Sequence, residues 1–168
     1  MMLLVGTAKG LFRVTSDAAG GDWSIDGPHL AGYSVLHTLE APDGRLYAAT
    51  SHKVWGAHIY TSDDAGASWT SLATAPEHPA ASGRGATRAV WYLALAGDSL
   101  LAGIDPAGLF RSDDGGASWQ PVAGLNQVTV VDHHVLTVRH QILSGVSGFI
   151  CDNDLLLTAY DLAELDSS

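Results

Sequence analysis

The sequence predicts an all-β protein made of repeated four-stranded antiparallel units. The first observation is an eight-residue stretch that occurs twice in almost the same form, as Ser62-Asp-Asp-Ala-Gly-Ala-Ser-Trp69 and Ser112-Asp-Asp-Gly-Gly-Ala-Ser-Trp119. A degenerate third copy, Ser16-Asp-Ala-Ala-Gly-Gly-Asp-Trp23, precedes them. The second observation is the spacing, since the three Trp residues lie 46 and 50 residues apart. This period is that of one β-propeller blade, so we predict a partial propeller of about three blades.

Strand signals recur in the same order around each of these octets. In the third unit, runs separated by Gly, Asp or Pro predict four antiparallel strands at 90–96, 99–104, 108–112 and 118–122. The second unit repeats the pattern at 34–39, 45–50, 57–62 and 68–73. The first unit shows three strands, at 2–7, 10–15 and 22–25, so its innermost strand is missing. Closed propellers commonly fill such a gap with a strand from the far end of the chain.

Each octet has the composition of a tight turn. Short Ser and Asp side chains hydrogen-bond neighbouring backbone amides, Gly takes the positive φ that such a turn needs, and Trp offers a large apolar plate. In the first copy Ala18 and Asp22 replace an Asp and a hydroxyl residue, so we expect a looser turn in which Trp23 contributes less. The predicted structural residues are Ser16, Trp23, Ser62, Asp64, Gly66, Ser68, Trp69, Ser112, Asp114, Gly116, Ser118 and Trp119.

The motif Ser-x-Asp-x-Gly-x-Ser-Trp resembles the Asp box, or BNR repeat, of sialidase-like β-propellers. Together with the flanking segments 3–13 and 108–119, it makes residues 1–125 similar to bacterial BNR-like repeat proteins often labelled exo-α-sialidase. The resemblance implies that the octets are structural turns remote from any active site.

Residues 126–168 form a divergent tail without an octet, which we expect not to be an independent domain. Its likeliest strands are at 128–138, where they would pair with the first blade or mediate a dimer. An Asp followed by a Leu-rich pattern predicts a helix over 152–165, which would instead cover the open side. The tail is thus a closing element, an interface between copies, or the product of a shortened or rearranged gene.

Composition limits the partners. A net charge of −10 argues against nucleic acid or an anionic membrane, because phosphates would be repelled. The single Cys151 cannot form an internal disulfide, and the apolar start 1–5 is too short for a signal sequence. No apolar run approaches the roughly 18 residues of a membrane helix. We therefore expect a cytoplasmic protein.

The strand order sorts the connecting loops onto two faces. The octets share one face with acidic residues, whereas the opposite loop face collects basic, aromatic and His residues. We predict that the loop face binds a small anionic or carbohydrate-like ligand, the alternative being that these loops simply carry polar residues. The candidate ligand-binding residues are Lys9, His29, His52, Trp55, His58, Arg84, Arg88 and Asp105.

A metal site is a weaker hypothesis. His52 and His58, with His29 or His37, could converge on an ion, but their spacing matches no metal motif. We therefore expect neither a metal nor another cofactor.

Enzymatic activity faces a stricter test. The sialidase resemblance implies three Arg around a carboxylate, a Tyr nucleophile beside a Glu, and an Asp acid/base. The family's Arg-Ile-Pro opening is absent, and no motif places Glu40, Glu77 or Glu164 beside a Tyr. The predicted function is a non-enzymatic scaffold or binder. The alternatives are a sialidase-like hydrolase fragment lacking its catalytic blades and an inert truncated product.

Overall fold

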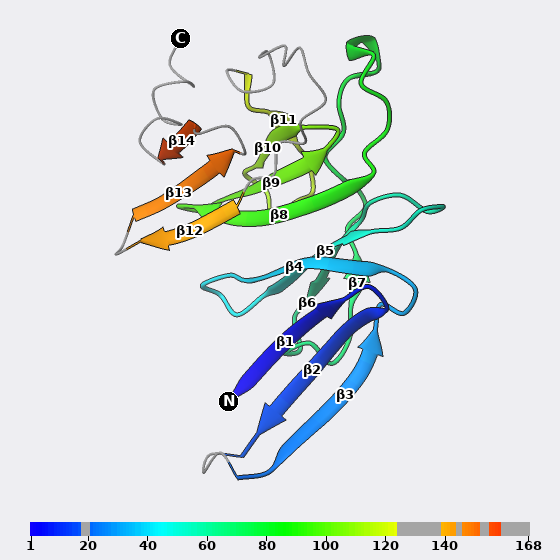
Figure 1. The fold of residues 1–168 in the computed structure, drawn as a ribbon, viewed down its shortest axis with the longest axis vertical. Helices are drawn as coiled ribbons and strands as arrows, with labels where there is room; N and C mark the ends of the chain where they lie inside the picture. The colour runs from blue at the N-terminus through cyan, green and yellow to red at the C-terminus, as the bar shows by residue number, and fades with distance from the viewer. Residues whose placement is uncertain (18–20, 124–138, 144–145, 152–154, 159–168) are drawn as a thin grey trace.

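The computed structural model describes residues 1–17, 21–123, 139–143, 146–151 and 155–158 (Figure 1). Its elements are antiparallel strands and one short 3-10 helix, η1 (Ala80–Ser82). Within these ranges no helix is long and apolar enough to cross a lipid bilayer.

The first eleven strands form three blades, and within each blade every strand pairs with the next one in the chain. Blade 1 contains β1 (Met2–Thr7), β2 (Gly10–Ser16) and β3 (Trp23–His29). Blade 2 contains β4 (Ser34–Glu40), β5 (Leu46–Ser51), β6 (Ile59–Ser62) and β7 (Thr70–Ser71). Blade 3 contains β8 (Ala89–Ala96), β9 (Ser99–Asp105), β10 (Gly108–Ser112) and β11 (Gln120–Pro121). The strand count predicted for each blade is confirmed.

Apolar side chains are buried where neighbouring blades meet. Blades 2 and 3 share a main cluster that includes Tyr47, Ile59 and Phe110, and they are also joined by a backbone pair between Ser51 and Ala89. A smaller cluster of Leu11, Val35 and Ala48 lies between blades 1 and 2. β5 is buried from Leu46 to Thr50 because it has a blade on each side. The sequence of a strand that is buried on both faces is a continuous apolar run rather than an alternation of apolar and polar residues.

The described part of the tail is a separate antiparallel sheet of β12 (Arg139–Leu143), β13 (Val146–Cys151) and β14 (Leu155–Thr158). The helix predicted over 152–165 is wrong at β14, which pairs with β13 through Leu155 opposite Cys151. A short apolar run such as Leu-Leu-Leu fits a buried strand as well as a helix, so periodicity alone could not decide. The strands predicted at 128–138 lie outside the described residues.

Candidate functional site

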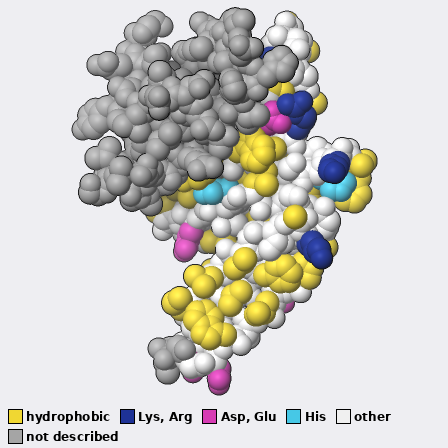
Figure 2. Space-filling view, in the orientation of Figure 1, with side chains coloured by type: hydrophobic (Ala, Val, Ile, Leu, Met, Phe, Trp, Pro, Cys, Tyr) yellow, Lys and Arg dark blue, Asp and Glu magenta, His cyan; other side chains and the backbone are white. Residues whose placement is uncertain are grey.

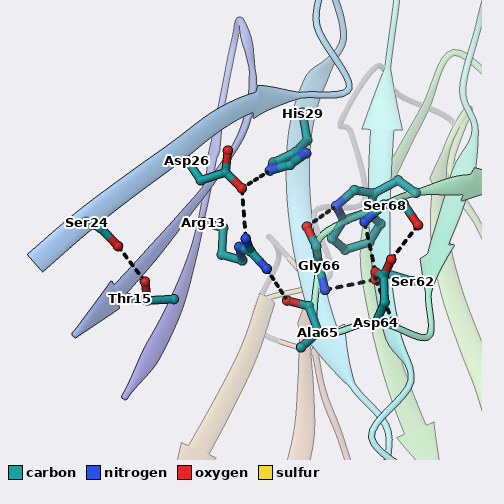
Figure 3. A network of polar contacts seen from close by, with 11 residues as sticks. Arg13, Thr15, Ser24, Asp26, His29, Ser62, Asp64, Ala65, Gly66 and Ser68 are labelled. Atoms are coloured by element: carbon teal, nitrogen blue, oxygen red, sulfur yellow. Dashed lines mark hydrogen bonds and ion pairs between the residues drawn. The ribbon is translucent and has the colours of Figure 1, made fainter. Parts of the chain in front are cut away.

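The octet of blade 2 is a turn closed by its own side chains (Figure 3). The Ser62 hydroxyl donates to Asp64 Oδ1 at 2.7 Å and accepts from the Gly66 amide at 2.9 Å. The Asp64 carboxylate also accepts the Ser68 amide at 2.8 Å and the Ser68 hydroxyl at 2.6 Å. Ser62 and Asp64 therefore each accept a backbone amide from further along the turn.

The octet of blade 3 repeats this network. Ser112 Oγ donates to Asp114 Oδ1 at 2.7 Å and accepts from the Gly116 amide at 2.7 Å. Asp114 accepts the Ser118 amide at 2.8 Å and its hydroxyl at 2.6 Å. The Ser118 hydroxyl, the Ser118 amide and the Ser112 hydroxyl lower the pKa of Asp114 to about 2. The same donors in blade 2, led by the Ser68 hydroxyl, also lower the pKa of Asp64.

Gly66 and Gly116 have the same kind of backbone conformation, whereas the tryptophans of the octets differ in burial and hydrogen bonding. The positive φ predicted for Gly66 and Gly116 is confirmed, at +81° and +95°. The Trp69 indole is partly buried and donates to the Gly66 carbonyl at 3.2 Å. Trp119 is also partly buried, but its buried Nε1 has no hydrogen-bond acceptor among the residues that the structure describes. Trp23, in the degenerate copy, is 48% exposed.

The octets also connect each blade to the blade before it, which sequence reasoning missed. Arg13 of blade 1 donates to the Ala65 carbonyl at 3.5 Å (Figure 3). Thr74, which follows blade 2, donates to the carbonyls of Gly116 and Ala117 at 3.0 and 2.9 Å. These donors lie 42 to 52 residues before their acceptors, outside the repeated motif. The octets are thus structural links between blades.

Tyr33, His52, Trp55 and His58 lie together on the loop face, and we call them the loop cluster. His52 stacks on Trp55 with ring centroids 4.1 Å apart and an angle of 15° between the planes. Tyr33 lies 5.4 Å from His52 and 5.7 Å from both Trp55 and His58. Two of the three predicted His residues of the candidate surface therefore gather around Trp55.

Hydrogen bonds within the β5–β6 connection hold three members of the loop cluster, His52, Trp55 and His58, in place. His52 Nδ1 accepts the amides of Val54 and Trp55, both at 3.0 Å, so Nδ1 carries no proton. His58 Nε2 lies 2.9 Å from the Trp55 carbonyl, to which it donates. Two backbone bonds also join His52 and Gly56. This rigid loop keeps Trp55 60% exposed and Val54 80% exposed, and Val54 is a surface residue that sequence reasoning missed.

The other predicted loop-face residues are divided between neighbouring loops. Arg88 forms a two-point ion pair with Asp105, at 2.7 and 2.9 Å, and its carbonyl accepts the Ser51 hydroxyl at 2.9 Å. Arg84 donates to the Ala107 carbonyl at 2.8 Å. The Lys9 carbonyl accepts the Gly32 amide at 3.4 Å, which joins the β1–β2 turn to the loop before β4.

His29 has a different environment from the loop cluster. Its Nε2 lies 3.2 Å from Asp26 Oδ2, and the same oxygen accepts Arg13 Nη2 at 2.9 Å (Figure 3). His29 thus joins a polar network within blade 1. In the part of the chain that the structure describes, no group of three or more His, Cys, Asp or Glu is placed to hold a metal ion.

The partly buried Tyr60 and Tyr92 have raised pKa values. Burial raises the pKa of Tyr92, and burial followed by the neighbouring Tyr33 hydroxyl raises that of Tyr60. A Tyr nucleophile needs the opposite shift, since the phenolate is the reactive form.

Comparisons with known proteins give the fold. No protein-family model matches the chain, and no curated protein matches it. A solved structure of YCF48 bound to D1 peptide aligns with a TM-score of 0.53 and 19% identity, covering 88% of this chain and 44% of that one. YCF48 from Cyanidioschyzon merolae aligns with a TM-score of 0.51 and 16% identity, covering 94% of this chain and 51% of that one.

The chain therefore spans about half the length of these structures. At such identities the similarity shows the fold alone, and the sialidase-like resemblance of the octets stays a prediction. The fold is that of a β-propeller, of which β1 to β11 form consecutive blades.

Proposed function

We propose that this chain is a non-enzymatic binding module whose loop face takes an anionic, carbohydrate-like ligand. The observation that carries the proposal is the rigid exposure of Trp55. A large apolar side chain that stays in water costs free energy, and here the surrounding hydrogen bonds hold it there. The face of the ring that does not stack on His52 provides a flat surface for the apolar face of a sugar.

The charges of the two faces support an anionic ligand. The octet face carries Asp63, Asp64, Asp113 and Asp114. The loop face carries the exposed Lys9 and Lys53, whereas Arg88 on the same face is paired with Asp105. Lys53 is exposed and adjoins Val54 and Trp55. A carboxylate beside a sugar ring would therefore meet a cation next to an aromatic surface.

An acidic polypeptide segment is the second candidate ligand. One of the similar structures is of YCF48 bound to D1 peptide, which shows that a related fold has been captured with a peptide. An exposed Trp beside an exposed Val is also typical of the anchors that dominate protein interfaces.

Titration calorimetry on the full chain distinguishes these ligands. The probes are 3′-sialyllactose, neutral lactose and a Glu-rich peptide that contains one Leu. We expect 3′-sialyllactose to bind, added salt to weaken binding, and Trp55→Ala to reduce affinity at least tenfold. The matched control is Trp23→Ala, which removes an indole of comparable exposure outside the loop face and should leave affinity unchanged.

Binding of the peptide alone would support the second candidate, and equal effects of the two Trp variants would refute the loop face as the site. A fluorogenic sialoside tests the remaining alternative. Its hydrolysis by the purified chain, with turnover above a no-protein control, would contradict a non-enzymatic role.

A further inference from the structure

Blade 1 carries an apolar face that is open to solvent. On β1, Leu4 packs on the cluster between blades 1 and 2, so the alternation of a strand turns Leu3 and Val5 to the opposite face. These two side chains are 44% and 42% exposed. Figure 2 shows hydrophobic side chains gathered over β1 to β3, at the lower end of the molecule.

The strand register carries this open face across the whole blade. Leu3 lies opposite Val14 on β2, and Val14 lies opposite Ile25 on β3. Trp23 is two residues before Ile25 and shares its side of the strand. Trp23 and Ile25 are 48% and 72% exposed. The open face is therefore lined by apolar residues on both outer strands of the blade.

The same positions are buried in the other two blades. The residue two positions before the first Ser of each octet pairs with Leu3 in blade 1, with Ala48 in blade 2 and with Ala102 in blade 3. Ala48 and Ala102, the equivalents of Leu3, are both fully buried. Ala48 belongs to the cluster shared with blade 1, and Trp69 packs against it. The open face of blade 1 is thus built as an inter-blade surface.

We propose that a second copy of this chain covers the open face through its own blade 1, related by a twofold axis. Met1, Leu3, Val5, Trp23 and Ile25 together expose on the order of 500 Å², the upper end of what a monomer normally leaves in water. Covering the face on two copies removes about 1,000 Å², which is the lower limit for a specific interface.

The burial of two apolar residues in blade 3 favours a twofold dimer over an open, head-to-tail assembly. Leu101 and Leu109 correspond to Tyr47 and Ile59, which face the following blade. They are only 5% and 4% exposed, so at these two described positions the far side of blade 3 is not open to solvent. Two copies that meet through one self-complementary face form a closed dimer, to which no third copy can add. The pair leaves the loop face free, so this inference does not depend on the proposed ligand.

Sedimentation velocity on the full chain from 1 to 100 µM tests the proposal. We expect a reversible equilibrium ending at about 35 kDa, twice the chain mass of 17.5 kDa. Ile25→Lys places a charge in the centre of the interface and should give a monomer with an unchanged circular dichroism spectrum. The matched control is Val54→Lys on the loop face, which should stay dimeric.

Three results would overturn the proposal. The first is a wild-type chain that is monomeric at 100 µM. The second is a dimer that resists Ile25→Lys, and the third is an assembly that grows beyond two copies. The wild-type mass decides the matter by itself even where a variant fails to fold.

Discussion

Gly116→Ala tests how tightly an octet is held between two blades. The substitution forces Ala to a φ of +95°, and its new Cβ would lie 2.4 Å from Leu72 Cδ1. The left-handed backbone costs about 1–2 kcal/mol. Leu72 packs on the main cluster, so displacing it adds about 1–2 kcal/mol of overpacking. We therefore expect a total loss of about 2–4 kcal/mol in the free energy of unfolding.

Two other glycines separate the strain from the steric overlap. At Gly66, with φ +81°, a Cβ would meet Leu4 Cδ2 at 3.4 Å, an ordinary contact. At Gly97, with φ +59°, it would meet nothing within 4 Å. Both Ala variants should therefore lose only the strain, about 1–2 kcal/mol. Urea unfolding followed by circular dichroism measures all three. A loss for Gly116→Ala no larger than that for Gly97→Ala would refute the inter-blade contact.

The other predictions concern the remaining octet residues and the loop cluster. Trp119→Ala should lower the free energy of unfolding by about 2–4 kcal/mol in chemical denaturation, because its indole is partly buried. Trp23→Ala should cost less, since that indole is 48% exposed. An equal cost for the two variants would show that the degenerate copy is not looser. The lowered pKa values of Asp64 and Asp114 mean that their stabilisation is present above pH 4 and is lost as the pH falls toward 2. Melting temperatures at pH 7, 4 and 2.5 should therefore fall less in Asp114→Asn than in wild type, and an identical fall would exclude the carboxylate as the cause. His52→Ala removes the acceptor of two loop amides, so it should weaken 3′-sialyllactose binding. It should lower the melting temperature by no more than about 3 °C. Unchanged binding would show that the loop does not need the His52 hydrogen bonds to bind the ligand.

The strands and turns of the blades could be predicted because their signals are local. The repeat fixes the spacing, and the positive φ of Gly66 follows from the tight turn around it. The hydrogen bond from Arg13 to the Ala65 carbonyl could not be predicted. It joins residues 52 positions apart, and no sequence pattern indicates which backbone carbonyl an Arg side chain will contact. The tail was misread at β14, where Leu-Leu-Leu suits either kind of secondary structure.

The candidate site could be predicted only in outline. Strand order alone brought His52, Trp55 and His58 to one face. The sequence did not show that His52 accepts two backbone amides and thereby fixes the exposure of Trp55. It also grouped His29 with them, whereas the structure places that imidazole against Asp26. Such choices of partner depend on side-chain geometry that residue spacing does not carry.

The central claim is that consecutive blades pack through their octets, and a nuclear Overhauser experiment on the isotope-labelled full chain tests it most directly. Gly116 lies against Leu72, and Gly66 lies against Leu4 of the preceding blade. The account predicts cross-peaks from the Gly116 Hα protons to the Leu72 methyls and from the Gly66 Hα protons to the Leu4 methyls. A spectrum in which both glycines contact only residues of their own blade would contradict it.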